Sequence, residues 1–156
     1  MTARDRLASA RAALAAAAVA AAVLWGVCAA LAVYASLVGV ALAGGTWIGG
    51  TGAVSISVAA AAAVGAAVAW RSRRVWSASH VALWIEERTP ALRYALVTAL
   101  ELPRGGVATE RIEARVAATE WQPAIRTATA RAIGIPLAAA LVAIVLLVAL
   151  RHFAGR

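Results

Sequence analysis

The sequence predicts an all-α integral membrane protein: a transmembrane hairpin, a third transmembrane helix, and short amphipathic cytoplasmic helices between spans two and three. Two stretches, residues 12–70 and 132–150, contain no Asp, Glu, Lys or Arg. The chain is also 63% hydrophobic, above the roughly 45–50% of soluble domains. A hydrocarbon core about 30 Å thick excludes charged groups, whereas soluble elements carry them on their outer surface. We therefore expect the lipid bilayer to be the main partner of this chain.

Residues 1–70 are predicted to form the hairpin. A helix over residues 12–43 would be about 48 Å long, so it should tilt or protrude, with its membrane section near residues 14–37. Five glycines in residues 44–52 favour a turn, and Trp47 suits the headgroup level. The second span, residues 53–70, would reach about 27 Å.

Residues 132–156 are predicted to be the third transmembrane helix and a short tail. Arg131 and Arg151 bracket the apolar stretch, and residues 141–150 are dense in Val, Ile and Leu. We place Pro136 near the start of this helix, where a missing backbone N–H costs little.

Basic residues gather at the ends of the hairpin that lie away from its glycine turn. These residues are Arg4, Arg6, Arg11, Arg71, Arg73 and Arg74. The positive-inside rule then predicts a cytoplasmic N-terminus and a C-terminus outside. The first charge-free stretch exceeds the roughly 7–15 residues of a signal-peptide core, so we expect an uncleaved span. Every basic residue is Arg and Ala dominates, which is typical of a GC-rich bacterial genome and predicts the bacterial inner membrane.

Residues 71–131 are predicted to form a cytoplasmic helical segment. Helices are expected over residues 75–88, 90–102 and 107–121, with Thr89 and Pro90 as N-cap and first helical residue. Each helix has an apolar stripe: Val81, Trp84 and Ile85; Leu92, Leu96, Ala99 and Leu100; Ala108, Ile112, Val116 and Thr119. So short a segment forms only a thin core. We therefore expect either a solvated cap that packs on itself or a segment that packs against the membrane surface or a protein partner.

No catalytic, cofactor-binding or metal-binding residues are predicted. His80 has no second ligand at metal-binding spacing and reads as a surface residue, and His152 reads as an interfacial flank. Glu86 and Glu87 project about 100° apart on a helix, so we expect solvated, salt-bridged side chains instead of an acid/base pair. The single Cys28 excludes an intramolecular disulfide.

The charge of +8 does not predict a nucleic-acid partner, because the arginines gather at the ends of the apolar stretches. The small residues Ala61, Gly65 and Ala69 would allow close approach of two helices, so the sequence leaves oligomerisation as an open alternative. Alanine-rich spans also produce such spacings by chance. The spans also lack the ionisable residues that transporters usually place there.

Residues 80–102 read His-Val-Ala-Leu-Trp-Ile-Glu-Glu-Arg-Thr-Pro-Ala-Leu-Arg-Tyr-Ala-Leu-Val-Thr-Ala-Leu-Glu-Leu. This segment resembles the juxtamembrane region of bacterial multi-pass membrane proteins of unknown function, which have an N-terminal transmembrane hairpin, a cytoplasmic helical segment and a third span followed by a long extracytoplasmic region. The resemblance covers residues 71–150. It implies the same three-span arrangement and no assigned activity. It also implies a truncated form, since this sequence ends shortly after Leu150.

The sequence is compatible with two functions from different classes. The first is a non-enzymatic membrane anchor or scaffold whose cytoplasmic helices pack at the inner membrane face or recruit a partner. The alternative is a small oligomeric pore or holin-like protein, although Ser36, Ser55 and Ser57 hardly make the polar stripe that pores need. An enzyme subunit that lends its spans to a catalytic partner is a third reading without a specific signal.

Overall fold

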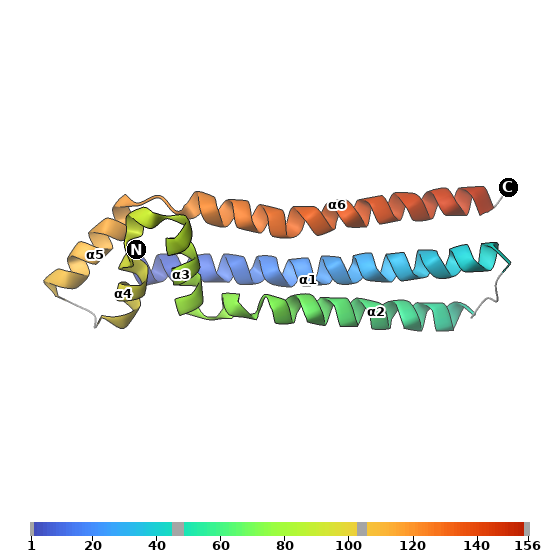
Figure 1. Ribbon diagram of the computed structural model, residues 1–156, viewed down its shortest axis with the longest axis horizontal. Helices are drawn as coiled ribbons and strands as arrows, with labels where there is room; N and C mark the ends of the chain where they lie inside the picture. The colour runs from blue at the N-terminus through green and yellow to red at the C-terminus, as the bar shows by residue number, and fades with distance from the viewer. Residues whose placement is uncertain (1, 45–48, 103–105, 155–156) are drawn as a thin grey trace. The chain divides into compact units, whose positions relative to one another are not determined.

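Helices account for all the regular structure in the part of the chain that the computed structural model describes, residues 2–44, 49–102 and 106–154 (Figure 1). The long helices are α1 (Ala3–Leu42), α2 (Gly50–Arg71) and α6 (Gln122–Ala154). The short elements between α2 and α6 are η1 (Arg73–Trp76), α3 (Ala78–Arg88), η2 (Pro90–Leu92), α4 (Ala95–Glu101) and α5 (Val107–Ala118), where η marks a 3-10 helix.

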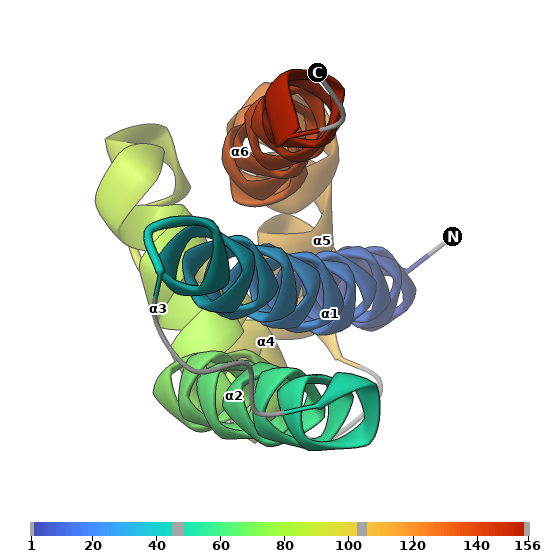
Figure 2. The same cartoon turned by 90° about the vertical axis from the view of Figure 1, so that its right-hand side faces the viewer.

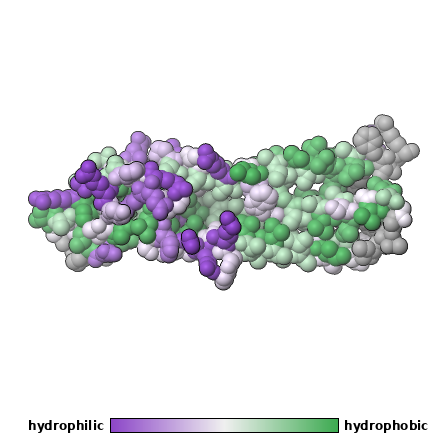
Figure 3. Space-filling view, viewed as in Figure 1, coloured by the Kyte–Doolittle hydropathy of each residue, from purple (hydrophilic) through white to green (hydrophobic). Residues whose placement is uncertain are grey.

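Three helices are long and apolar enough to cross a membrane, judged by length and composition: Ala3–Leu42, Gly50–Arg71 and Gln122–Leu150. The predicted class, an all-α membrane protein with three transmembrane helices, is therefore confirmed. In Figure 3 hydrophilic residues gather over the short elements, whereas hydrophobic residues dominate most of the length of the three long helices.

The chain divides into two compact units. One, which we call the polar unit, comprises Met1–Ala18 and Ser72–Arg131; the other, the apolar unit, comprises Val19–Arg71 and Ala132–Arg156. The first turns of α1 thus pack with the segment between the second and third spans, whereas the sequence-based division assigned residues 1–70 to one hairpin.

The third long helix begins ten residues before the apolar stretch that predicted it. It starts at Gln122, with Pro123 in its first turn, where a missing N–H is tolerated. The expectation that Pro136 lies near the helix start is therefore wrong: Pro136 lies inside α6 and cannot donate to the carbonyl of Ala132. The charge-free stretch marked the lipid-compatible part of the helix and not the helix itself.

The predicted helix over residues 90–102 is two elements, η2 and α4. Between them Arg93 and Tyr94 adopt left-handed backbone conformations, with φ of 46° and 62°. Thr89 does occupy the N-cap position with Pro90 after it, but its side chain makes no capping hydrogen bond. The two neighbouring helices are also shorter than predicted, since α3 starts at Ala78 and α5 ends at Ala118.

In the apolar unit, α1 lies between α2 and α6 (Figure 2). Small residues bring α1 and α2 together: a Cβ added at Gly26 would lie 2.9 Å from the carbonyl oxygen of Ala61, and one added at Gly65 would lie 3.3 Å from that of Ala22. The spacing of Ala61 and Gly65 was compatible with contact between two chains. In the structure both residues pack against α1 of the same chain. Close approach through small residues is a common way of packing helices in lipid.

The contact between α1 and α6 also uses compact groups. The Cys28 thiol donates a hydrogen bond to the carbonyl oxygen of Pro136 over 3.3 Å, and the side chains of Pro136 and Ala140 are buried. Large apolar side chains of α6, such as Val142 and Val145, point outward and are 60% and 66% exposed. Small residues inside and large apolar residues outside are the arrangement expected of helices solvated by lipid.

Both helix ends at the hairpin turn use a glycine with positive φ. Gly44 follows α1 with φ of 86°, and Gly49 precedes α2 with φ of 84°. These conformations are readily adopted only by glycine, which explains part of the glycine enrichment of residues 44–52. Trp47, expected at the headgroup level, lies outside the described residues.

Replacing Gly26 by alanine is expected to lower the free energy of unfolding by about 1–2 kcal/mol, because the added methyl group must displace the backbone of Ala61. The matched control is Gly39→Ala in the same helix, where a Cβ meets nothing within 4 Å and alanine should be neutral or stabilising. Unfolding of the purified variants in mixed micelles, followed by circular dichroism, checks this. Equal stability of the two variants would show that α1 and α2 do not pack so closely.

Candidate functional site

The histidines and glutamates that the sequence analysis weighed as possible site residues do not form a reactive site together. His80 is exposed on α3, Glu87 is exposed on the same helix, and His152 is exposed on α6. No group of three or more His, Cys, Asp or Glu suited to hold a metal ion occurs among the residues that the structure describes. The notable chemistry of the chain lies instead in the polar unit, where charged side chains bond to the ends of short helices.

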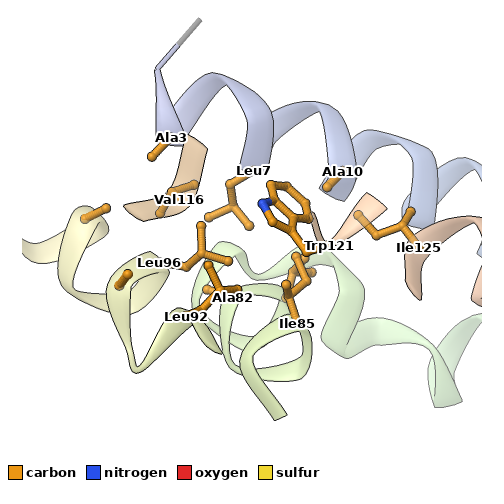
Figure 4. Close-up of a cluster of buried hydrophobic side chains, with 13 residues drawn as sticks. Ala3, Leu7, Ala10, Ala82, Ile85, Leu92, Leu96, Val116, Trp121 and Ile125 are labelled. Atoms are coloured by element: carbon orange, nitrogen blue, oxygen red, sulfur yellow. The ribbon is translucent and has the colours of Figure 1, made fainter. Parts of the chain in front are cut away.

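The polar unit has its own hydrophobic core, formed by α1, α3, η2, α4, α5 and the start of α6 (Figure 4). Its centre is Trp121, whose indole lies between Leu7 and Ala10 of α1 and Ile85 of α3. Trp121 is 2% exposed, and Ile85 is completely buried. The apolar stripes of the first two predicted short helices are largely confirmed, since Val81, Ile85, Leu92, Leu96 and Ala99 are all buried. In the third stripe Val116 is buried, whereas Ala108 is exposed.

Glu86 caps the N-terminus of α4. Its Oε1 accepts hydrogen bonds from the backbone N–H groups of Leu96, at 2.7 Å, and Val97, at 3.3 Å. Its side chain is 7% exposed, so the expectation of a solvated, salt-bridged Glu86 is wrong. A buried carboxylate fits here because the first N–H groups of a helix have no intrahelical partner and carry partial positive charge. The other carboxylate oxygen, Oε2, finds no donor within the described part of the chain.

Arg4 caps the opposite end of α4. Its Nε donates to the carbonyl oxygen of Ala99 at 2.9 Å, and its Nη2 donates to those of Leu100 at 3.3 Å and Leu102 at 2.6 Å. The last carbonyl groups of a helix carry partial negative charge, which a guanidinium complements. With only seven residues α4 is too short to be stable alone, and Glu86 and Arg4 complete both of its ends.

Arg6 makes a similar bond to α5. Its Nη1 donates to the carbonyl oxygen of Val116 at 2.9 Å, in the last turn of that helix. The guanidinium carbon also lies 5.2 Å from the centre of the Trp121 ring, within the range of a cation–π interaction. The charges of Arg4 and Arg6 were used to predict the membrane orientation. Their hydrogen bonds also hold α4 and α5 in place within the polar unit.

A pocket of about 170 Å³ lies beside Arg6 and Trp121. Its polar lining comes from Arg6 and Ser9 of α1 and from Gln122 and Arg126 of α6, and its apolar lining includes Trp121. The Nε1 group of Trp121 is buried and has no acceptor among the described residues. The pocket therefore combines two guanidinium groups with further hydrogen-bonding side chains at one edge of the core.

Sequence reasoning missed Glu86, Arg4, Arg6 and Trp121 as the residues that organise this unit. The predicted apolar stripe gave no signal for Glu86, because on a helix it projects about 100° from the stripe residue Ile85. Its neighbour Ala82, about 40° away, proves to be fully buried only in the folded unit. The carbonyl partners of Arg4 and Arg6 follow only from the tertiary structure. No protein-family model matches this chain, and neither the curated proteins nor the solved structures gave a similar protein.

Proposed function

We propose that this protein is a non-enzymatic integral membrane anchor or scaffold of the bacterial inner membrane. Its polar unit would lie in the cytoplasm, where it packs at the membrane face or recruits a protein partner. The observation that carries the proposal is a folded polar unit, with a buried core and charged helix caps, in a chain that has three helices apolar enough to span a bilayer. Such a chain can hold a small folded surface at a membrane.

The hydrogen bonds of Arg4 support the proposed orientation. Because Arg4 bonds to the carbonyl groups of Ala99 and Leu102, the N-terminus and the segment between α2 and α6 must share one compartment. Two crossings between them, by α1 and α2, satisfy this requirement, and a third crossing by α6 puts the C-terminus on the other side. The arginines at the ends of the hairpin then favour the cytoplasm for the polar unit.

Exposed apolar side chains of the polar unit support contact with a partner or with the membrane surface. Trp76 and Leu83, beside and within α3, are 57% and 43% exposed, and Tyr94 and Val107 are 69% and 67% exposed. These side chains are available for such a contact, in which burial would remove their apolar surface from water.

Side-chain hydrogen bonds within the spans favour the anchor over the pore. The hydroxyl groups of Ser36, Ser55 and Ser57 each donate to the carbonyl oxygen four residues earlier in their own helix, at 2.8, 2.9 and 2.8 Å. Hydroxyls bonded in this way offer little to a water-filled channel, which needs polar groups along its lining.

Membrane topology is tested with single cysteines in a Cys28→Ser background. A cysteine at the exposed position Thr51 should react with a membrane-impermeant maleimide in spheroplasts, whereas one at exposed Glu87 should react only after the membrane is opened. The reverse pattern, or extraction of the chain by alkaline carbonate, would refute the proposed placement.

Recruitment is tested with a photo-crosslinking amino acid at Leu83 in growing cells, with Arg111, an exposed charged position on α5, as the control. A scaffold should give the same crosslinked protein from Leu83 in replicate cultures and much less from Arg111. Lipid crosslinks from Leu83 would support packing at the membrane face. The absence of both, together with dye leakage from vesicles that contain the chain, would favour the pore.

A further inference from the structure

The pocket between the first turns of α1 and α6 has the chemistry of an anion site. Arg6 and Arg126 supply two positive charges, and Ser9 and Gln122 supply further donors. None of the described residues that line the pocket is acidic. Guanidinium groups are well suited to phosphate, because their N–H groups can donate two parallel hydrogen bonds to its oxygens.

Arg6 is held in place before any ligand arrives. Its bond to the carbonyl of Val116 and its position over the Trp121 ring fix the guanidinium, and this bond uses only one of the five N–H donors of the group. A ligand that binds a fixed side chain loses less conformational entropy than one that must order it. Trp121 supplies a second, independent indication of a ligand, since this pocket-lining residue is 2% exposed and its buried N–H lacks an acceptor within the described chain.

The position of the pocket along its helices matches the headgroup layer of a bilayer. The charge-free stretches begin at Ala12 and Ala132. At 1.5 Å per residue, Ser9 lies about 4.5 Å before the first and Arg126 about 9 Å before the second, measured along the helix axes. The headgroup layer on each side of the hydrocarbon core is roughly 5–8 Å thick, so the lining side chains lie at or near its depth. Basic pockets between membrane helices on the cytoplasmic side are known to suit acidic headgroups.

We propose that this pocket binds the phosphate of an acidic phospholipid headgroup from the cytoplasmic leaflet. This inference rests on the proposed membrane placement of the polar unit. The volume of about 170 Å³ fits a phosphate with part of its glycerol and is smaller than the roughly 300–1,000 Å³ of pockets that enclose whole small molecules. The acyl chains would therefore remain in the bilayer, where the exposed apolar side chains of the long helices can contact them.

The test is native mass spectrometry of the full chain in neutral detergent, titrated with phosphatidylglycerol or with phosphatidylcholine. The first phosphatidylglycerol should bind more tightly than the first phosphatidylcholine. Arg126→Gln should weaken it about tenfold, the loss expected for one charged hydrogen-bonded contact. The matched control is Arg131→Gln, which removes the same charge from an exposed position of the same helix outside the pocket and should change affinity less than twofold.

A second pair of variants tests the pocket without changing charge. Ala13→Phe places a ring at a lining position and should also weaken the first phosphatidylglycerol, whereas Ala12→Phe, at an exposed neighbouring position outside the lining, should not. Equal losses in Arg126→Gln and Arg131→Gln would overturn the proposal, because they would indicate only general attraction to positive charge. Displacement of the lipid by millimolar glycerol 1-phosphate or inorganic phosphate would also overturn it, in favour of a soluble anion.

Failure of the lipid site and failure of the proposed function would give different results. A chain that resists carbonate extraction and gives crosslinks from Leu83, but shows no preference for phosphatidylglycerol, overturns the lipid site alone. A chain that carbonate extracts overturns the membrane placement, and with it both proposals. Thermal unfolding of each variant is recorded beside the titration, so that a loss of binding counts only for variants that keep the wild-type melting temperature.

Discussion

Replacing Trp121 by alanine should destabilise the polar unit by about 3–5 kcal/mol, the usual loss when a large buried aromatic side chain is truncated. Trp121 is 2% exposed and belongs to a core built from α1, α3, η2, α4, α5 and the start of α6. The substitution also removes the ring over which Arg6 lies. Because each 1.4 kcal/mol corresponds to a factor of ten, amide hydrogens in α3 and α4 should exchange at least a hundredfold faster wherever their exchange requires this unit to unfold.

Hydrogen exchange followed by mass spectrometry measures this change peptide by peptide. The control is Trp76→Ala, because Trp76 is 57% exposed and its truncation leaves no buried cavity. Exchange in α3 and α4 should then stay within about threefold of the wild type, as expected for an exposed position. Similar exchange in the Trp121 and Trp76 variants would contradict a core centred on Trp121.

Replacing Glu86 by alanine should cost about 2–3 kcal/mol, because it leaves the backbone N–H groups of Leu96 and Val97 without their acceptor in a buried place. The loss should concentrate in α4, whose N-terminus this carboxylate caps. Amide exchange in α4 should therefore accelerate by one to two orders of magnitude, whereas α2 should be unaffected.

Two controls separate the cap from the charge. Glu87→Ala removes the same charge one residue away, from an exposed side chain, and should change stability by no more than about 0.5 kcal/mol. Glu86→Gln keeps a side-chain oxygen that can accept both hydrogen bonds, so it should recover much of the loss. If Glu86→Ala and Glu87→Ala were equally mild, the capping role of Glu86 would be wrong.

The apolar helices were predictable because hydrocarbon imposes a constraint that each span satisfies within its own sequence. Their ends were less predictable. Since the charge-free stretch served as the guide, α1 was expected from residue 12, although it begins at Ala3. A spacing of four and three residues, through Ala3, Leu7, Ala10, Leu14 and Ala17, marks the buried side of its early turns and was available in the sequence.

The polar unit was predictable in its apolar stripes but not in its helix caps. Val81, Ile85 and Leu96 follow a helical period, and burial follows from that period. The partners of Arg4 and Glu86 are backbone atoms of another helix, and no local pattern in the sequence encodes them. The left-handed backbone conformations of Arg93 and Tyr94 were not predictable either, because neither arginine nor tyrosine normally signals such a turn.

The bonds of Arg4 and Arg6 impose an order on biosynthesis. Their carbonyl acceptors at Ala99 and Val116 lie 95 and 110 residues further along the chain. At translation rates of roughly 5–20 residues per second, the two arginines wait on the order of 5–20 s for these acceptors to leave the ribosome. The hairpin can enter the bilayer during that interval, and the polar unit can close only afterwards. A nascent chain stalled with α2 outside the ribosome and Ala99 still inside it should therefore be integrated in the membrane while its N-terminus is still open to protease.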